Sequence, residues 1–434
     1  MGLNRLVRPS AETDISWITP ILYETDVACP TLPVLKSGDS IGGLMGPLTY
    51  NFDQYKIVWQ EAYPLAITAA PFPPLPRATP LAVGQISVAT FNVENYFDTA
   101  DDTGDAAEPK LTTAELTLKQ TKLAHTITQT LQCPTLLAII EVENAALLEG
   151  LALALAEPCG FRYTVSHLES YDGRGIDNAL LSDPRRVAVQ SVVLRQSCVS
   201  IPTSTGAGDC PAGQNWLFGR PPLEVELVID GRSLIVWVNH FKSKRGGEVE
   251  SEPERLAQAD YLGQLAAERL TADPSAALIA LGDFNDYAES PPLRLLAERG
   301  QLTNVLHQLP PEEQYTFVFS GASQMIDGIL LSSSLLAQVA QVQILHINAD
   351  YPDQYGLDIS AEFLPYKSAD HDPSLVVLNW VEEATTAEPA LATAASFPWG
   401  WVVAGLAAVG WGWYGRAMAQ TADSKLDCKP SALS

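Results

Sequence analysis

The sequence predicts an α/β layered fold, and three features of residues 81–380 carry that prediction. Apolar runs such as ISVATFNV, LLAIIEV, SLIVWVNHF and AALIALGDF are continuous, which is typical of strands buried on both faces. Helical stretches at 114–131, 145–156 and 254–270 alternate with these runs, as in α/β domains. Each apolar run ends in polar residues, so we expect a functional site at the strand ends.

Residues 1–80 precede this domain and have a different pattern. Short alternating apolar runs between residues 33 and 75 predict a small β module, and the Pro-rich PFPPLPRATP at 71–80 predicts a stiff linker. The start, MGLNRLVRPSAETDISW, contains no apolar run of the kind that a signal peptide needs. Either export uses another route or the chain begins within a longer gene product.

The segment after residue 380 predicts a membrane anchor. Residues 381–396 are rich in small side chains and are expected to form a flexible tether. Residues 397–415, FPWGWVVAGLAAVGWGWYG, carry no charge and have aromatic residues at both edges, which predicts a transmembrane helix. Arg416, Lys425 and Lys429 follow it, so 416–434 is expected to be a cytoplasmic tail of a single-pass cell-membrane protein with an extracellular domain. A buried Gly-rich hairpin is the alternative.

The charge of the chain limits how it can bind a polyanion. A formal net charge of -25 at pH 7 and a sequence pI near 4.5 exclude a broad basic surface that holds nucleic acid. A protein of this composition that handles phosphate needs a metal ion or a local basic pocket.

The six cysteines favour disulfides in an oxidising compartment. Cys133 lies near Cys159 in the sequence and Cys198 lies near Cys210, whereas Cys29 and Cys428 stand far out near the ends. None forms a CxxC or Cys/His zinc pattern. A Cys198–Cys210 bridge would close a surface loop, and free buried thiols are the alternative.

The strand ends carry acids, amides and imidazoles. Carboxylates and amides are ligands for Mg²⁺ or Ca²⁺, whereas imidazoles exchange a proton near neutral pH. Hydrolysis of a phosphodiester needs both charge neutralisation and proton transfer. The residues at these ends, in order, are Asn92, Glu141, Asn239, His240, Asp283, Asn285, Asp327, Asp370 and His371.

The chain contains a series of short motifs: FNVEN at 91–95, IEVEN at 140–144, RGIDNALL at 174–181, FGRPPL at 218–223, NHFKSK at 239–244, GDFND at 282–286, IDGILLS at 326–332 and SADHDPSLVV at 368–377. This series resembles the endonuclease/exonuclease/phosphatase superfamily, whose members are DNase I-like, and most closely its bacterial extracellular nuclease branch. The resemblance implies a four-layered α/β sandwich of two packed mixed β-sheets flanked by helices. The module at 33–75 resembles the last strands of an oligonucleotide-binding barrel.

The resemblance also implies roles for individual residues. A divalent metal, Mg²⁺ or alternatively Ca²⁺ or Mn²⁺, is expected at Glu141, Asn92 and Asp370. Arg220 and Lys242 are expected to meet the substrate phosphate. The catalytic residues implied are His240, Asp283, Asn285, Asp327 and His371. Whether Asp327 or Asp370 orients His371, and which imidazole activates water, stays open. Asp177 matches a family acid, or else it only fixes its own strand end.

The function expected from the sequence is that of a metal-dependent phosphodiesterase, an extracellular nuclease acting on nucleic acid, with DNA as the first choice. No protein partner is predicted. Ile140 and Gly328 depart from common family residues and leave the substrate open. The alternatives are a phosphatase or phospholipase C-like enzyme acting on small phosphates or lipid head groups, and a catalytically silent surface binding domain. The remaining histidines are expected to be surface or capping residues: His125, His167, His307 and His346.

Overall fold

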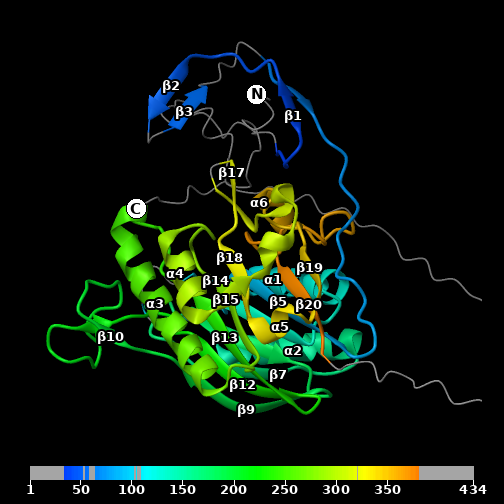
Figure 1. Cartoon of the computed structure of the whole chain (residues 1–434). Helices are drawn as coiled ribbons and strands as arrows, with labels where there is room; N and C mark the ends of the chain where they lie inside the picture. The colour runs from blue at the N-terminus through cyan, green and yellow to red at the C-terminus, as the bar shows by residue number, and fades with distance from the viewer. Residues whose placement is uncertain are drawn as a thin grey trace, which may run out of the picture. The chain divides into compact units, whose positions relative to one another are not determined.

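Two six-stranded mixed β-sheets form the centre of the computed structural model (Figure 1). The structure describes residues 34–51, 54–57, 64–101, 104, 109–319 and 321–380. The first sheet has the order β19-β20-β5-β6-β8-β7 and the second β15-β18-β14-β13-β12-β9. Strands β5 and β6 pair in parallel, as do β13 and β14, and the other pairs in these sheets are antiparallel.

The strands of the two sheets have the following bounds. The first sheet contains β5 (Gln85–Tyr96), β6 (Leu136–Val142), β7 (Thr164–His167), β8 (Asp177–Ser182), β19 (Val339–Ile344) and β20 (Ser374–Asn379). The second contains β9 (Val187–Leu194), β12 (Leu223–Ile229), β13 (Arg232–His240), β14 (Leu278–Asp283), β15 (Leu302–Asn304) and β18 (Asp327–Ser332).

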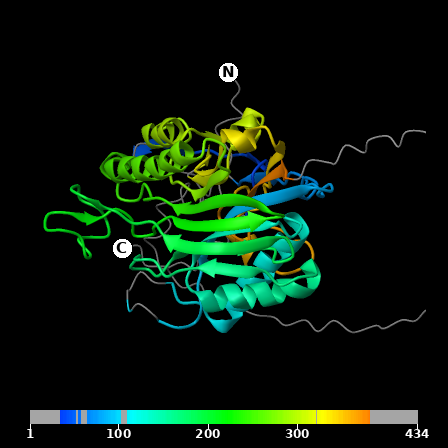
Figure 2. The ribbon, with the colours of Figure 1, turned by 60° about the horizontal axis from the view of Figure 1, so that its bottom comes forward.

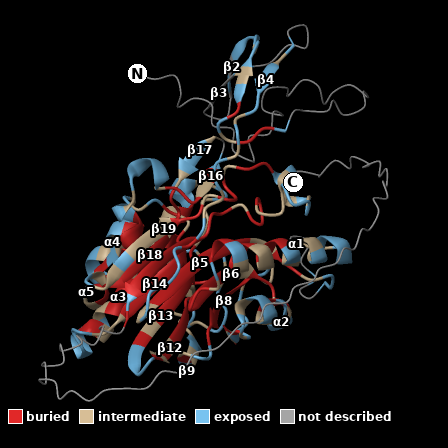
Figure 3. Ribbon diagram, turned by 90° about the vertical axis from the view of Figure 1, so that its right-hand side faces the viewer, coloured by how far each residue is buried: buried red, intermediate tan, exposed pale blue. Residues whose placement is uncertain are grey.

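The main core lies between the two sheets. Val88 and Ala138 of the first sheet share it with Val236 and Ile279 of the second. Because side chains alternate along a strand, the next residues point to the opposite faces, where a second core joins β5 and β6 to helices and a third does the same for β13 and β14. Figure 3 shows these strands as buried, between helices with exposed outer sides. The sequence prediction of two packed sheets flanked by helices is confirmed.

The helices at 113–125, 145–159 and 248–272 were predicted from the sequence, whereas the helix at 291–300 was not. Helix α1 (Thr113–His125), continued by the π-helical turn η4 (Thr126–Thr130), and α2 (Ala145–Cys159) pack on the first sheet. Helices α3 (Glu248–Ala272) and α4 (Pro291–Gly300) pack on the second sheet. Its green strands lie side by side in Figure 2. Thr112 and Glu115 form a reciprocal capping box that starts α1, because each side chain accepts from the other's backbone N–H. Helix α3 begins earlier than the predicted 254.

Short elements complete the described chain. The short helices are α5 (Ser333–Leu336), α6 (Asp353–Gly356), η5 (Val305–Gln308) and η6 (Pro311–Glu313). The small antiparallel pairs are β1 (Ser40–Gly42) with β4 (Ala66–Thr68), β2 (Leu48–Asn51) with β3 (Gln54–Ile57), β10 (Cys198–Val199) with β11 (Asn215–Trp216), and β16 (Phe317–Phe319) with β17 (Ala322–Gln324).

The expectations for the two ends of the chain have different outcomes. Between residues 34 and 70, the described strands form two separate antiparallel pairs, so the partial oligonucleotide-binding barrel stays a prediction. No helix in the described part of the chain is both long and apolar enough to cross a membrane. The tether at 381–396, the predicted transmembrane helix at 397–415 and the tail at 416–434 lie outside the described residues.

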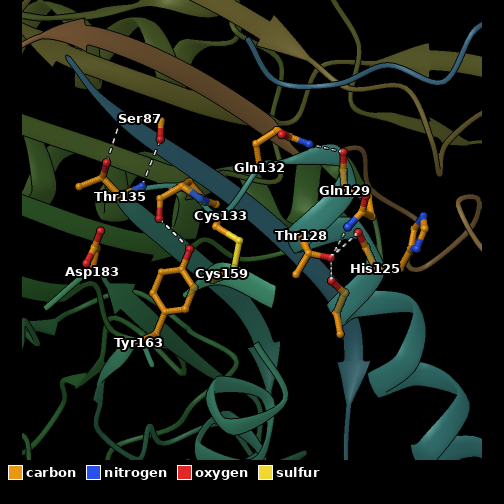
Figure 4. Close-up of a disulfide and its surroundings, with 12 residues drawn as sticks. Ser87, His125, Thr128, Gln129, Gln132, Cys133, Thr135, Cys159, Tyr163 and Asp183 are labelled. Carbon is orange, nitrogen blue, oxygen red and sulfur yellow. Dashed lines mark hydrogen bonds between the residues drawn. A yellow bond between two sulfur atoms is a disulfide. The ribbon is translucent and has the colours of Figure 1, made fainter. Parts of the chain in front are cut away.

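Both disulfides suggested by the cysteine spacing are present. Cys133, which follows η4, is bonded to Cys159 at the end of α2 (Figure 4). Beside this bond, the hydroxyl of Tyr163 donates to the carbonyl of Pro134 at 2.8 Å. Cys198 and Cys210 close a loop next to β10. Cys29 and Cys428 lie outside the described residues.

Candidate active site

Three strands of the second sheet place their polar ends side by side. His240 ends β13, Asp283 ends β14 and Asp327 begins β18. In the strand register His240 lies opposite Asp283, and Asp283 lies opposite Asp327. Because β13 and β14 are parallel and β18 is antiparallel to β14, two strand ends and one strand start meet at one edge of the sheet. The three residues therefore form a row.

A close approach of two backbones makes this row possible. Gly282 has φ +130°, and a Cβ at this position would lie 2.1 Å from the carbonyl oxygen of Asn239. Only glycine fits such a conformation and such a contact. The backbone N–H of Asn285 then donates to Asp283 Oδ1 at 2.8 Å, which fixes one oxygen of that carboxylate.

The first sheet delivers Glu141 to the same place through a backbone irregularity. Glu141 has a left-handed φ of 67°, and the pairing of β6 with β8 shifts register between Ile140 and Val142. Such bulges re-aim side chains, and non-glycine residues in this conformation concentrate at functional sites. The amide nitrogen of Asn92 lies 3.4 Å from Glu141 Oε1 and 3.1 Å from Asp283 Oδ2, so it connects the two sheets.

The two imidazoles of the predicted site flank Asp283. His240 Nε2 lies 3.8 Å from Asp283 Oδ2 and 3.7 Å from Glu141 Oε1. On the other side, His371 Nε2 lies 3.9 Å from the same Asp283 oxygen. His371 Nδ1 is 2.7 Å from Asp327 Oδ2, whereas its Nε2 lies 3.9 Å from Asp370, so Asp327 is the acid that orients this ring. The carboxylate of Asp283 is thus shared between two imidazoles.

Burial and neighbouring charges shift the pKa values of Asp283, His240 and His371 in different directions. Burial raises the pKa of Asp283 to about 7, and the charge of Asp327 acts in the same direction. Burial also lowers the pKa of His240 well below its ordinary value, and the nearby Arg220 contributes. For His371 burial opposes the charged form, but Asp327 and Asp370 outweigh it and hold the pKa well above the ordinary value. At neutral pH His240 is therefore neutral and His371 is cationic.

Most of these residues line one pocket of about 590 Å³. Asn92 and Asp327 are not among its lining residues: Asn92 contacts the carboxylate of Asp283, and Asp327 contacts the ring of His371. Among the described residues the pocket walls include Glu141, Tyr171, Arg174, Arg220, His240, Lys242, Arg245, Asp283, Asn285, Asp370 and His371.

The cations of the pocket include two that the sequence interpretation missed. Arg220 donates to Asp172 Oδ2 at 2.9 Å and to the carbonyl of Phe241 at 3.0 Å, which fixes its guanidinium. Lys242, Arg174 and Arg245 also line the pocket, and the contact of Lys242 with a phosphate stays a prediction. Arg174 begins the RGIDNALL motif, so its place in that motif was the signal that could have identified it.

The acids of the pocket suit a divalent cation. Asp370 is half-buried, its pKa is raised by desolvation, and its Oδ1 is shielded from solvent but accepts no hydrogen bond. A buried carboxylate oxygen without a donor is an unusual cost that a cation would remove. Glu141 and Asp370 line the same pocket and fit the role. Asn92 presents its nitrogen to the carboxylates and accepts from Glu94 N–H at 3.0 Å, so its metal role stays a prediction.

Three other residues have structural roles. Asp177 accepts from the backbone N–H of Ser170 at 2.8 Å and lies 2.8 Å from His167 Nε2, so it fixes its own strand end. The prediction that His167 and His346 are surface or capping residues is wrong. Both rings are largely buried and contact buried carboxylates, His167 that of Asp177 and His346 that of Asp372, each at 2.8 Å. His307 is exposed, as predicted.

Comparison with known proteins supports the family seen in the motifs. A family model described as "Endonuclease/Exonuclease/phosphatase family" matches residues 87–358. No curated protein sequence gave a significant match. Solved structures that resemble the chain include a truncated TDP2 from Caenorhabditis elegans, with 15% identity, a TM-score of 0.43 and coverage of 68% of this chain and 97% of that one.

Two further structures have the same level of similarity. The catalytic domain of human Nocturnin with bound sulfate is 16% identical, with a TM-score of 0.43 and coverage of 68% and 94% of the two chains. A family protein from Bacteroides thetaiotaomicron is 16% identical, with a TM-score of 0.46 and coverage of 68% and 97%. Because the family model matches well over half of the chain, this protein belongs to the endonuclease/exonuclease/phosphatase family and is a hydrolase acting on phosphoric ester bonds.

Proposed function

We propose that the protein is a metal-dependent phosphodiesterase that hydrolyses nucleic acid, DNA in the first place, by attack of water. One observation carries the proposal: the Asp283 carboxylate lies between a neutral and a cationic imidazole, 3.8 Å from His240 and 3.9 Å from His371. An acid with a pKa of about 7 beside a cationic imidazole supplies a base and an acid in one pocket.

Each of these groups has a task in phosphodiester hydrolysis. Asp283 accepts a proton from the water whose oxygen attacks phosphorus, and Asn285 helps to hold that carboxylate. His371 donates a proton to the oxygen that leaves as the phosphorus–oxygen bond breaks, and Asp327 stabilises its cation. His240 donates a hydrogen bond to a phosphoryl oxygen. A divalent cation held by Glu141 and Asp370 would neutralise charge on the phosphate.

The cations of the pocket favour nucleic acid as the substrate. The chain carries a net charge of -25, yet Arg174, Arg220, Lys242 and Arg245 line the pocket. The same pocket contains the acids Glu141, Asp172, Glu254, Asp283 and Asp370, so these cations together with a bound divalent cation would offset the negative charge locally and attract a phosphate of a polyanion.

The proposal includes a location outside the cytoplasm, with a membrane anchor at 397–415. Two disulfides support an oxidising compartment, because such bonds are rare in the cytosol. The uncharged run FPWGWVVAGLAAVGWGWYG supports the anchor.

The experiment that tests this function uses the full chain under oxidising conditions. Supercoiled plasmid and a single-stranded oligodeoxynucleotide are incubated with Mg²⁺, Mn²⁺ or Ca²⁺ and with EDTA, beside a His371→Ala variant. We expect cleavage that requires metal and that the variant lacks. Intact DNA under every metal, with turnover of phosphate monoesters or phospholipid head groups, would replace the nuclease by the phosphatase or phospholipase C-like alternative.

A further inference from the structure

An exposed tyrosine forms part of the active-site pocket without a role in the chemistry described above. Tyr171 is 42% exposed and lines the same pocket as His240 and Arg220. Its backbone N–H donates to the carbonyl of Gly219 at 2.9 Å, which ties its loop to the residue before Arg220. The backbone of Tyr171 is therefore tied next to Arg220, the cation expected to meet the phosphate.

A second aromatic ring supports Tyr171 from behind. The ring centroids of Tyr171 and Trp216 are 4.2 Å apart, with planes at 36°. The indole N–H of Trp216 donates to Asp209 Oδ1 at 2.5 Å. Gly208 lies against the indole, because a Cβ there would be 2.2 Å from Trp216 Cδ2. Trp216 is thus held between a glycine backbone and Tyr171, and cannot turn away without breaking these contacts.

The loop that carries Trp216 is itself covalently closed. The Cys198–Cys210 disulfide and the pairing of β10 with β11 hold its two ends together. The backbone N–H of Trp216 donates to Gly206 at 2.9 Å, and Thr203 Oγ1 donates to the carbonyl of Trp216 at 2.8 Å. A two-ring platform held in this way, in the wall of a pocket that contains Arg220 and Lys242, is more structure than a solvated loop needs.

We infer that Tyr171 is a stacking platform for a nucleobase of the nucleotide next to the scissile phosphate, and that the enzyme therefore acts on single-stranded nucleic acid in preference to an intact duplex. Aromatic rings bind bases of any type through their faces, whereas paired bases in a duplex have no free face to offer. Arg220 and Lys242 line the same pocket as Tyr171 and would hold the phosphates. The inference rests on the proposed nuclease function and names its substrate class.

The test compares substrates with and without a base. One substrate is a single-stranded oligodeoxynucleotide, and the other is methyl p-nitrophenyl phosphate, a phosphodiester without a base. Tyr171→Ala should lower kcat/KM for the oligonucleotide roughly 10-fold or more, mainly through KM, and leave the small diester unchanged. Tyr171→Phe should retain the wild-type values because the ring remains. Tyr287→Ala, which removes a tyrosine of similar exposure, 38%, that is not among the described pocket residues, should behave as wild type.

The outcomes separate this inference from the proposed function. Equal losses on both substrates, or an unchanged oligonucleotide rate, would overturn the platform while leaving the nuclease in place. The same holds if the wild-type enzyme cleaves duplex as fast as single strand and Tyr171→Ala alters neither. A wild-type enzyme that hydrolyses the small diester but no oligonucleotide would overturn both, and a melting curve for each variant shows whether it folds.

Discussion

Asp327 Oδ2 lies 2.7 Å from His371 Nδ1, and the same oxygen accepts a hydrogen bond from Thr316 Oγ1 at 2.6 Å. Both the acid and the imidazole are buried. The contact leaves Nε2 of His371 as the nitrogen that faces the pocket, 3.9 Å from Asp283. Asp327 is therefore a positioning residue: it fixes the ring and stabilises its cation without reaching the substrate.

Replacing Asp327 by Asn tests this relationship. Asn keeps the shape but removes the charge that favours the imidazolium, so we expect kcat to fall by about two powers of ten or more. Single-turnover rates on an oligodeoxynucleotide measure the loss. The double variant Asp327→Asn with His371→Ala should be no slower than His371→Ala alone, because the two residues act as a unit. Additive losses would contradict a role that runs through His371.

Each of the two imidazoles of the site should be needed for turnover. His240→Ala and His371→Ala are expected to lower turnover by about two to four powers of ten with the fold intact. His307→Ala is the matched control, since this histidine is exposed and is not among the described residues that line the pocket. Turnover near the wild-type rate in both site variants would remove the proposed mechanism.

The sequence predicted the layers and most of the site because both depend on local patterns. Continuous apolar runs identify strands buried on both faces, and the polar residue at each end is then placed by the parallel pairing. Glu141, His240 and Asp283 follow in this way. The choice between Asp327 and Asp370 as the partner of His371 could not be predicted, because it depends on how β18 lines up with β14.

The roles of residues outside the motifs could not be predicted because they depend on contacts with residues far away in the sequence. The place of Tyr171 depends on a ring 45 positions further along the chain, and nothing near either residue indicates the contact. His346 likewise pairs with Asp372, whose buried carboxylate needs a cation that only the folded chain brings near. Long-range packing decides such positions.

The pH dependence of kcat/KM should be bell-shaped. Burial raises the pKa of Asp283 to about 7, so the rate rises as this base loses its proton near neutral pH. The pKa of His371 lies well above its ordinary value, so the rate falls at alkaline pH as the acid loses its proton. Asp327→Asn should move the alkaline limb to lower pH, because Asp327 is a cause of that raised pKa. An alkaline limb that stays in place would assign it to another group.

In the absence of metal, a variant without the charge of Asp283 should be more stable than the wild type. The raised pKa means that ionising Asp283 opposes folding, so its unfavourable contribution is absent below about pH 4, grows between about pH 4 and 7, and is complete above about pH 7. With EDTA at pH 8, Asp283→Asn should therefore unfold at a higher temperature than wild type while being inactive. Mg²⁺ should raise the melting temperature of the wild type more than that of Glu141→Gln. Thermal unfolding monitored by circular dichroism measures both effects.

The buried Asp372 should be a stability residue and not a catalytic one. Its Oδ1 accepts from the backbone N–H groups of Ile347, Asn348 and Ala349 at 2.9, 2.7 and 3.1 Å. Asp372→Ala leaves these donors unpaired, so we expect a loss of about 1–3 kcal/mol in the free energy of unfolding. Denaturant titration measures it, with the exposed Glu298→Ala as control. A loss no larger than that of the control would contradict the role.

His346 makes part of this stability depend on pH. Burial opposes its charge, but the hydrogen bond and charge of Asp372 outweigh burial and raise the pKa of His346 above its ordinary value. The contribution is therefore complete below about pH 6.5 and is lost as the pH rises through the folded value. Replacing His346 by Gln should flatten the dependence of unfolding free energy on pH in that window. A variant with the wild-type slope would point to another titrating group.

Removing each disulfide in turn should distinguish an effect on stability from an effect on substrate binding. The Cys133–Cys159 bond joins residues 26 positions apart. It lowers the entropy of the unfolded chain and so stabilises the fold by about 3 kcal/mol, and the shorter Cys198–Cys210 loop contributes slightly less.

Cys133 and Cys159 are not among the described residues of the active-site pocket, so their double Ser variant should melt at lower temperature yet cleave at the wild-type rate while folded. The Cys198→Ser/Cys210→Ser variant should melt similarly but also show a higher KM for single-stranded oligonucleotide, because the loop that holds Trp216 behind Tyr171 is released. Equal KM values for the two variants would mean that the disulfide-closed loop serves stability alone.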